Sequence, residues 1–197
     1  TNELDNNNIH LSNISDVTMK ISGCPNSCGH HPIANFGFSG ASRRVNGRLA
    51  PYYNILSDGN VYENRTKISE PIALIPAKNV PLFVKDILNE YIKNRTVYED
   101  FNQFTKTTEK TIIKNLVEKY STIPKYEENK DYYIDFGSKE EFSLAGRGAG
   151  ECGAGVFDII ESDIESAKSD LDKKDFYTAI LYLTKSLLVT RGIDPKN

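Results

Sequence analysis

Several features are scarce or missing in this sequence. No run of apolar residues approaches the roughly 20 residues that a helix needs to cross a membrane. The polar, asparagine-rich residues 1–16 do not resemble a signal peptide. The formal net charge is only -3, which gives no reason to expect binding to nucleic acid or to a membrane surface. We therefore expect a cytoplasmic protein with neither kind of partner.

Cysteine is also scarce, with 3 residues in 197, and tryptophan is absent. In a cytoplasmic protein, so few cysteines argue against a disulfide framework. Hydrophobic residues make up 39% of the chain, which is enough to form a core. The length fits one ordinary domain with an appendage, or two small domains.

Two of the three cysteines lie in one short motif. It reads Ile21-Ser22-Gly23-Cys24-Pro25-Asn26-Ser27-Cys28-Gly29-His30-His31. Cys24 and Cys28 could place two thiolates on one metal centre. Pro25 fixes its own φ, and Gly23 and Gly29 allow turns or close backbone approaches that a Cβ would forbid. The pattern indicates a loop built around a bulky group.

The motif and its continuation closely resemble the second cysteine motif of the sirohaem- and iron–sulfur-dependent nitrite and sulfite reductases. In that family the motif reads Gly-Cys-Pro-Asn-x-Cys and runs on into Gly-Phe-x-Gly. Here the continuation reads Ile33-Ala34-Asn35-Phe36-Gly37-Phe38-Ser39-Gly40. The resemblance covers about residues 16–120 and fades after them.

The resemblance implies two cofactors, a [4Fe–4S] cluster and sirohaem. In the family, four cysteines in two pairs hold the cluster, and the later cysteine of the second pair also ligates the sirohaem iron. By position, Cys24 is then a cluster ligand and Cys28 is the bridging ligand. Asn26, Ser27 and Gly29 are placed to point amides at the sulfurs. The implied reaction is the six-electron reduction of sulfite to sulfide or of nitrite to ammonia. The electrons would come from a donor such as ferredoxin or a flavoprotein.

The family's first cysteine pair, and its substrate-binding Arg and Lys residues, would fall before Thr1. Cys152 lies far downstream in an unrelated context. We therefore expect this chain to be the C-terminal part of a longer reductase. It would carry no catalytic residue of its own and would be inactive in isolation.

Basic and histidine side chains close to the motif are further candidates for cofactor binding. Sirohaem is rich in carboxylates, so basic groups are needed to pair with them, and Arg43, Arg44 and Arg48 form a basic cluster. The alternative is that these three arginines lie at the solvent-exposed tip of a hairpin and bind no cofactor. Either His30 or His31 could donate a hydrogen bond to a sirohaem carboxylate, and ordinary packing or exposure is the alternative.

Periodicity predicts both strands and packed helices, an α+β fold. The resemblance implies that the sheet is antiparallel or mixed and that the domain is of the reductase half-domain type. Alternating apolar residues predict a strand over 16–22, and Asn46-Gly47 predicts a hairpin turn. Helical spacing begins at Pro81. The expected domain spans residues 1–120. Its expected strands are 16–22, 34–40, 51–56 and 72–75, and its expected helices are 81–91 and 97–120.

Residues 121–155 read as a connector with a short strand at 132–136 and a glycine-rich hinge at 143–155. The segment 156–197 then predicts an antiparallel pair of helices that resembles the start of a HEPN-type helical domain. The ribonuclease variants of that family depend on an Arg…His motif, and these helices contain no histidine, so the resemblance implies no nuclease activity. The first helix should use Ile159, Ile160, Ile164 and Ala167 against the second helix's Ala179, Leu183 and Leu187.

An alternative function remains open from the sequence. The chain could be a decayed, non-catalytic domain whose cysteines hold structural zinc together with His30 and His31, or hold no metal at all. Its helices would then mediate association with a protein partner.

Overall fold

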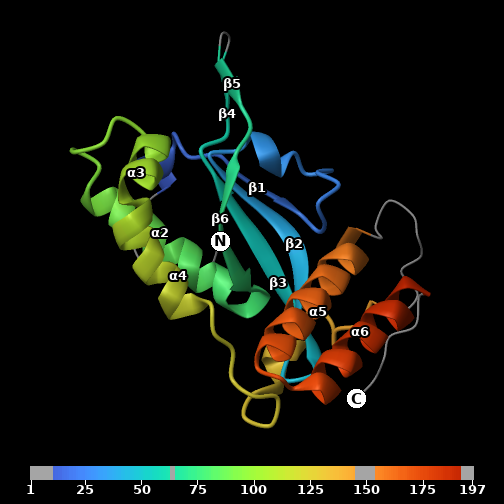
Figure 1. Cartoon of the computed structure of the whole chain (residues 1–197). Helices are drawn as coiled ribbons and strands as arrows, with labels where there is room; N and C mark the ends of the chain where they lie inside the picture. The colour runs from blue at the N-terminus through green and yellow to red at the C-terminus, as the bar shows by residue number, and fades with distance from the viewer. Residues whose placement is uncertain (1–10, 63–64, 145–153, 192–197) are drawn as a thin grey trace. The chain divides into compact units, whose positions relative to one another are not determined.

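The computed structural model describes residues 11–62, 65–144 and 154–191 and is a mixed α+β structure (Figure 1). The chain divides into two compact units. The first unit comprises residues 1–23, 27–39 and 53–123, and the second comprises residues 24–26, 40–52 and 124–197. The predicted α+β class is confirmed at this coarse level.

A four-stranded sheet runs in the order β1-β2-β3-β6. Its strands are β1 (Met19–Ser22), β2 (Phe36–Val45), β3 (Arg48–Ser57) and β6 (Glu70–Pro76). Strand β1 lies at one edge and pairs in parallel with β2, with Met19 opposite Phe36 and Ser22 opposite Ser39. The chain segment that carries the cysteine motif therefore connects two parallel neighbours.

A tight turn at Asn46-Gly47 joins β2 to β3, as the sequence predicts. Both residues have positive φ, 49° and 79°, which is the backbone conformation that Asn-Gly favours in two-residue hairpins. The strands are longer than the sequence predicts, so Arg43, Arg44 and Arg48 lie inside strands rather than in the turn. A smaller hairpin follows, with β4 (Asn60–Tyr62) and β5 (Arg65–Lys67).

In the described residues of the first unit, three α-helices follow the sheet. Helix α2 (Val80–Lys93) has Pro81 in its first turn, as expected. The helical stretch predicted over about 97–120 is present over residues 101–120, so it begins later than predicted and contains a π-helical turn. Helix α3 (Phe101–Thr108) begins where the Asp100 carboxylate accepts a hydrogen bond from the Gln103 amide, and a π-helical turn (Glu109–Ile113) separates α3 from α4 (Lys114–Tyr120).

The core of the first unit is rich in aromatic rings. Phe36 of β2 meets Phe38 at 4.8 Å between ring centroids, edge to face, and meets Phe101 of α3 at 5.4 Å. Tyr91 of α2 packs edge to face on Phe101 at 5.2 Å. The buried core residues of this unit are Ile14, Phe36, Phe38, Ile55, Ile75, Phe83, Ile87, Leu88, Tyr91, Phe101, Phe104, Ile113 and Tyr120.

The second unit contains two helices that run side by side, α5 (Ala154–Asp172) and α6 (Phe176–Thr190). Residues 173–175 join them, and the Asp175 carboxylate caps α6 by accepting from the Thr178 amide at 3.1 Å. The predicted helical pair is present in these residues. The predicted strand at 132–136 is wrong, because Lys130–Tyr133 forms a 3-10 helix and only an isolated bridge, Ile134 to Glu141, follows it.

The buried face of α6 differs from the predicted one. Ala179 is buried as expected, but Leu183 is 42% exposed and Leu187 is 68% exposed. Lys185 and Ser186 are buried in their place.

Most of the predicted glycine-rich hinge, residues 145–153, lies outside the described residues. No helix in the described part of the chain is long and apolar enough to cross a membrane.

Candidate functional site

The cysteine motif forms the segment that leaves β1 at Ser22 and reaches a 3-10 turn, η2 (His31–Ile33), just before β2. Ser27 and His30 both adopt left-handed backbone conformations, with φ of 62° and 54°. The His30 amide donates to the Ser27 carbonyl at 2.7 Å. The loop is therefore tightly turned at its second half.

Ser22 holds this part of the loop closed. Its hydroxyl oxygen accepts a hydrogen bond from the Gly29 amide at 3.0 Å and lies 2.8 Å from Nδ1 of His31. Ser22 and His31 are both buried. One hydroxyl thus connects the end of β1 to both ends of the Gly29–His31 turn.

Two glycines of the motif are required by close backbone approaches. A Cβ on Gly29 would lie 2.2 Å from the Ile21 carbonyl oxygen, and a Cβ on Gly37 would lie 2.3 Å from the His31 carbonyl oxygen. A Cβ atom cannot lie so close to a carbonyl oxygen, so both positions require glycine, which has no Cβ. A Cβ on Gly23, in contrast, would meet nothing within 4 Å. The glycine pattern at Gly29 and Gly37 is therefore explained by the loop's own packing.

Both thiols of the motif are free. Cys24 is half-buried and Cys28 is exposed. Asn26 and His30 are exposed as well. Among the described residues, no group of three or more His, Cys, Asp and Glu side chains converges as a ready metal site.

His31 lies in a different environment from its neighbour His30. Burial lowers the pKa of the His31 imidazole below its usual 6.5, so the ring is neutral at neutral pH. Its Nδ1 already has a partner in the Ser22 hydroxyl. His31 is therefore buried within the loop, whereas His30 is exposed at the surface.

Arg44, from β2, is the most deeply buried of the three arginines. Its Nε lies 3.0 Å from Oδ1 of Asp163 on α5, and the two side chains are 2% and 0% exposed. Its Nη1 also donates to the Gly47 carbonyl at 3.3 Å. Nη2 of Arg44 and Oδ2 of Asp163 are buried without a hydrogen-bond partner in the described part of the chain.

Lys185 of α6 belongs to the same buried group of charges. Burial lowers its pKa, and the nearby positive charge of Arg44 lowers it further. Burial raises the pKa of Asp163, against the opposing effect of Arg44. Sequence reasoning missed both residues. The available signal was that Lys185 is the single charged residue of helix α6.

The other two arginines are half-exposed and also have acidic partners. Arg43 contacts Ser162 at 3.3 Å and Glu165 at 3.5 Å, both on α5. Arg48 pairs with Glu141 at 3.1 Å, and its guanidinium lies 3.9 Å from the centre of the Tyr126 ring. Each arginine of the predicted basic cluster therefore has a carboxylate from a later part of the chain beside it.

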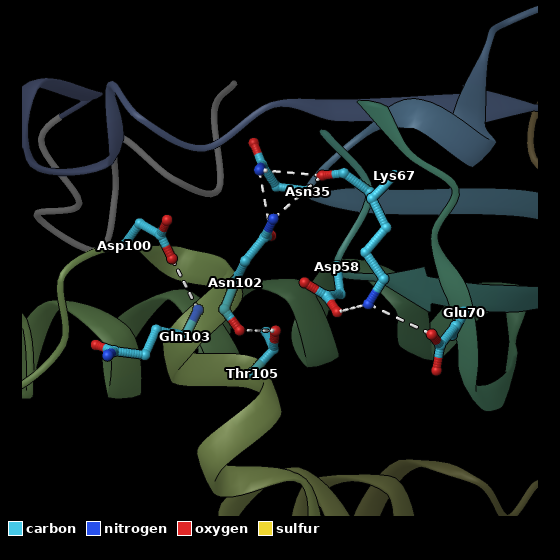
Figure 2. Close-up of polar contacts among 9 residues, drawn as sticks. Asn35, Asp58, Lys67, Glu70, Asp100, Asn102, Gln103 and Thr105 are labelled. Carbon is cyan, nitrogen blue, oxygen red and sulfur yellow. Dashed lines mark hydrogen bonds and ion pairs between the residues drawn. The ribbon is translucent and has the colours of Figure 1, made fainter. Parts of the chain in front are cut away.

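A second polar group, in the first unit, centres on Asn35 of the motif's continuation. Its side-chain oxygen accepts from the Thr18 amide at 2.9 Å and from the Thr18 hydroxyl at 2.6 Å. Its side-chain nitrogen donates to the Gly59 carbonyl at 3.3 Å and to Oδ1 of Asn102 at 3.2 Å (Figure 2). All four hydrogen-bonding positions of the Asn35 amide are used, so this residue joins the segment just before β1, the segment before β4 and helix α3.

Charged side chains lie close to this network. Lys67 of β5 forms ion pairs with Asp58 and with Glu70, the latter at 3.4 Å (Figure 2). Asp58 has a positive φ of 70° in the turn between β3 and β4. These contacts stabilise the base of the small hairpin, and each member already has a partner of opposite charge.

Comparison of the sequence with protein-family models and with curated proteins finds no match.

Proposed function

We propose that this chain is the cofactor-binding C-terminal part of a sirohaem- and [4Fe–4S]-dependent reductase of sulfite or nitrite. The observation that carries the proposal is the pair of free thiols in the Gly-Cys-Pro-Asn-x-Cys motif. Cys24 and Cys28 lie four positions apart, neither is buried in a core, and Cys28 is exposed. The glycines and Ser22 account for the shape of the loop, so the two thiols are not needed to stabilise it.

The donor chemistry fits an iron–sulfur cluster, which is held by cysteine thiolates. Cys24 and Cys28 would supply two of these thiolates, and a longer polypeptide would supply the others. When bound, the cluster and sirohaem would supply the electrons for the reduction of sulfite or nitrite. A ferredoxin or a flavoprotein would provide these electrons to the cofactors.

The three arginines fit the sirohaem carboxylates unequally. Arg43 and Arg48 keep 40% and 39% of their side chains exposed, so each could turn toward an anionic group. Arg44 fits poorly, because its guanidinium is buried against Asp163. Among the histidines, His30 is the better candidate donor, since Ser22 already engages Nδ1 of the buried His31.

The proposal is tested by expressing the chain together with the upstream sequence of its gene and recording the visible spectrum and iron content. We expect strong visible absorption and iron, with sulfite- or nitrite-reducing activity. Cys28→Ser should abolish the activity and disturb the spectra of both cofactors. Cys152→Ser, which removes the cysteine outside the motif, is the matched control and should retain them.

Two results would contradict the proposal. One is a colourless protein that contains zinc, which would support the alternative of a structural zinc module. The other is an unchanged spectrum and activity in Cys28→Ser.

A further inference from the structure

The cysteine motif holds the backbone at Cys28 through the residues on both sides of it. On one side, Ser27 has a left-handed backbone, and its carbonyl accepts from the His30 amide at 2.7 Å. On the other side, the Gly29 amide donates to the Ser22 hydroxyl at 3.0 Å. Gly29 also packs so closely on β1 that a Cβ would lie 2.2 Å from a carbonyl oxygen of that strand. The backbone at Cys28 is therefore fixed from both directions, although Cys28 itself is exposed.

His31 in turn holds the Ser22 hydroxyl. Nδ1 of His31 lies 2.8 Å from that oxygen, and both residues are 4% exposed. A serine hydroxyl has one proton to donate and lone pairs with which to accept. We assign the proton to the bond with Nδ1, because the oxygen then keeps its lone pairs for the Gly29 amide. Two hydrogen bonds in series thus connect the imidazole to the residue that follows Cys28.

Both members of this series are anchored on the four-stranded sheet. Ser22 is the last residue of β1, which pairs in parallel with β2. His31 begins η2, and a Cβ on Gly37 of β2 would lie 2.3 Å from the His31 carbonyl oxygen. Cys28 lies in the segment between these two anchors. The strands therefore fix the position of its backbone through Ser22 and His31.

We propose that Ser22 and His31 are positioning residues that hold Cys28 ready to ligate iron. The proposal rests on the proposed function, since it takes Cys28 to be a ligand of the cofactors. Groups that form hydrogen bonds around metal ligands fix the orientation of those ligands, and their loss commonly costs about 10–100-fold in metal affinity. Ser22 and His31 act in this way through the Gly29 amide and are not ligands themselves.

The first test uses the 197-residue chain without cofactors. In the wild type, NMR should show a slowly exchanging Gly29 amide and an order parameter of about 0.85 for the Cys28 backbone amide. Ser22→Ala and His31→Leu should each raise the Gly29 exchange rate at least about tenfold and lower the order parameter below about 0.6. His31→Asn keeps a polar group that can take the place of Nδ1 and should restore values close to those of the wild type.

Ser39→Ala is the matched control. Ser39 lies opposite Ser22 in the register of β1 and β2 and is equally buried, at 4%. This variant loses the same hydroxyl from the neighbouring strand but keeps the Gly29 contact, so neither value should change. Unchanged exchange and order in Ser22→Ala would overturn the proposal, and so would equal changes in Ser39→Ala. If circular dichroism shows that Ser22→Ala unfolds, the comparison of His31→Leu with His31→Asn decides.

The second test uses the chain together with the upstream sequence of its gene. Iron should pass to an excess of chelator at least about tenfold faster in Ser22→Ala than in the wild type, and at the wild-type rate in Ser39→Ala. Equal rates from iron-loaded Ser22→Ala and wild type would overturn this proposal and leave the proposed function standing. A wild-type protein without iron would overturn the proposed function, and this proposal with it.

Discussion

Arg44 and Asp163 form an ion pair from which solvent is almost completely excluded, with Nε and Oδ1 3.0 Å apart. The two residues are far apart in the sequence, on β2 and on α5. Two charges that are buried together depend on each other, because removal of one leaves the other without compensation. This pair therefore fixes how α5 lies against β2 within the second unit.

We expect Asp163→Ala to lower the free energy of unfolding by about 3–5 kcal/mol, since it leaves the Arg44 guanidinium buried and unpaired. Urea denaturation followed by circular dichroism measures the loss. Glu165→Ala is the control, because its contact with Arg43 is exposed at both ends and should cost less than about 1 kcal/mol. Equal small losses in the two variants would show that the buried pair is not important for stability.

Two glycines of the cysteine motif should respond differently to alanine. Gly29→Ala places a Cβ 2.2 Å from the Ile21 carbonyl oxygen and should destabilise the first unit by about 1–3 kcal/mol or more. Gly23→Ala meets nothing within 4 Å and should change stability by no more than about 0.5 kcal/mol. Thermal denaturation of both variants compares them directly. A Gly29→Ala protein as stable as Gly23→Ala would contradict the close approach of the loop to β1.

His31 should make the stability of the first unit depend on pH near neutrality. Its pKa is lowered in the folded protein, so below the ordinary value of 6.5 the unfolded chain binds more protons than the folded one. The free energy of unfolding should therefore fall as pH decreases from 6.5 until the folded state is protonated too. The slope cannot exceed about 1.4 kcal/mol per pH unit for one group.

Denaturation between pH 7.5 and pH 5 measures this dependence. His31→Gln should remove it, whereas His30→Gln, a change at an exposed neighbour, should leave it in place. A pH dependence that persists in His31→Gln would assign it to other groups.

The Asn35 amide is a point in the first unit at which the change of a single atom should be damaging. In Asn35→Asp, a carboxylate oxygen replaces the nitrogen that donates to the Gly59 carbonyl and to Oδ1 of Asn102. Three oxygens would then face one another in a buried position, which should cost about 1–3 kcal/mol or more. Asn26→Asp, at an exposed position of the same motif, should be nearly neutral. Chemical denaturation of the two variants is the measurement, and equal stabilities would contradict the network.

Local chemistry in the sequence was sufficient to predict several elements. The Asn46-Gly47 turn follows from the preference of these residues for positive φ, and the start of α2 follows from Pro81 and the apolar spacing after it. The two helices at the end of the chain follow from their length and periodicity. These predictions succeed because each rests on interactions between residues that are close in the chain.

Only the tertiary structure decided which partners distant residues find. Apolar periodicity favours Leu183 and Leu187 as the buried residues of α6, but Lys185 is buried in their place beside Asp163 and Arg44. The predicted basic cluster likewise could not reveal that Asp163, Glu165 and Glu141 lie against its arginines. The physical reason is that local patterns carry no information on long-range electrostatic pairing, which depends on where strands and helices meet.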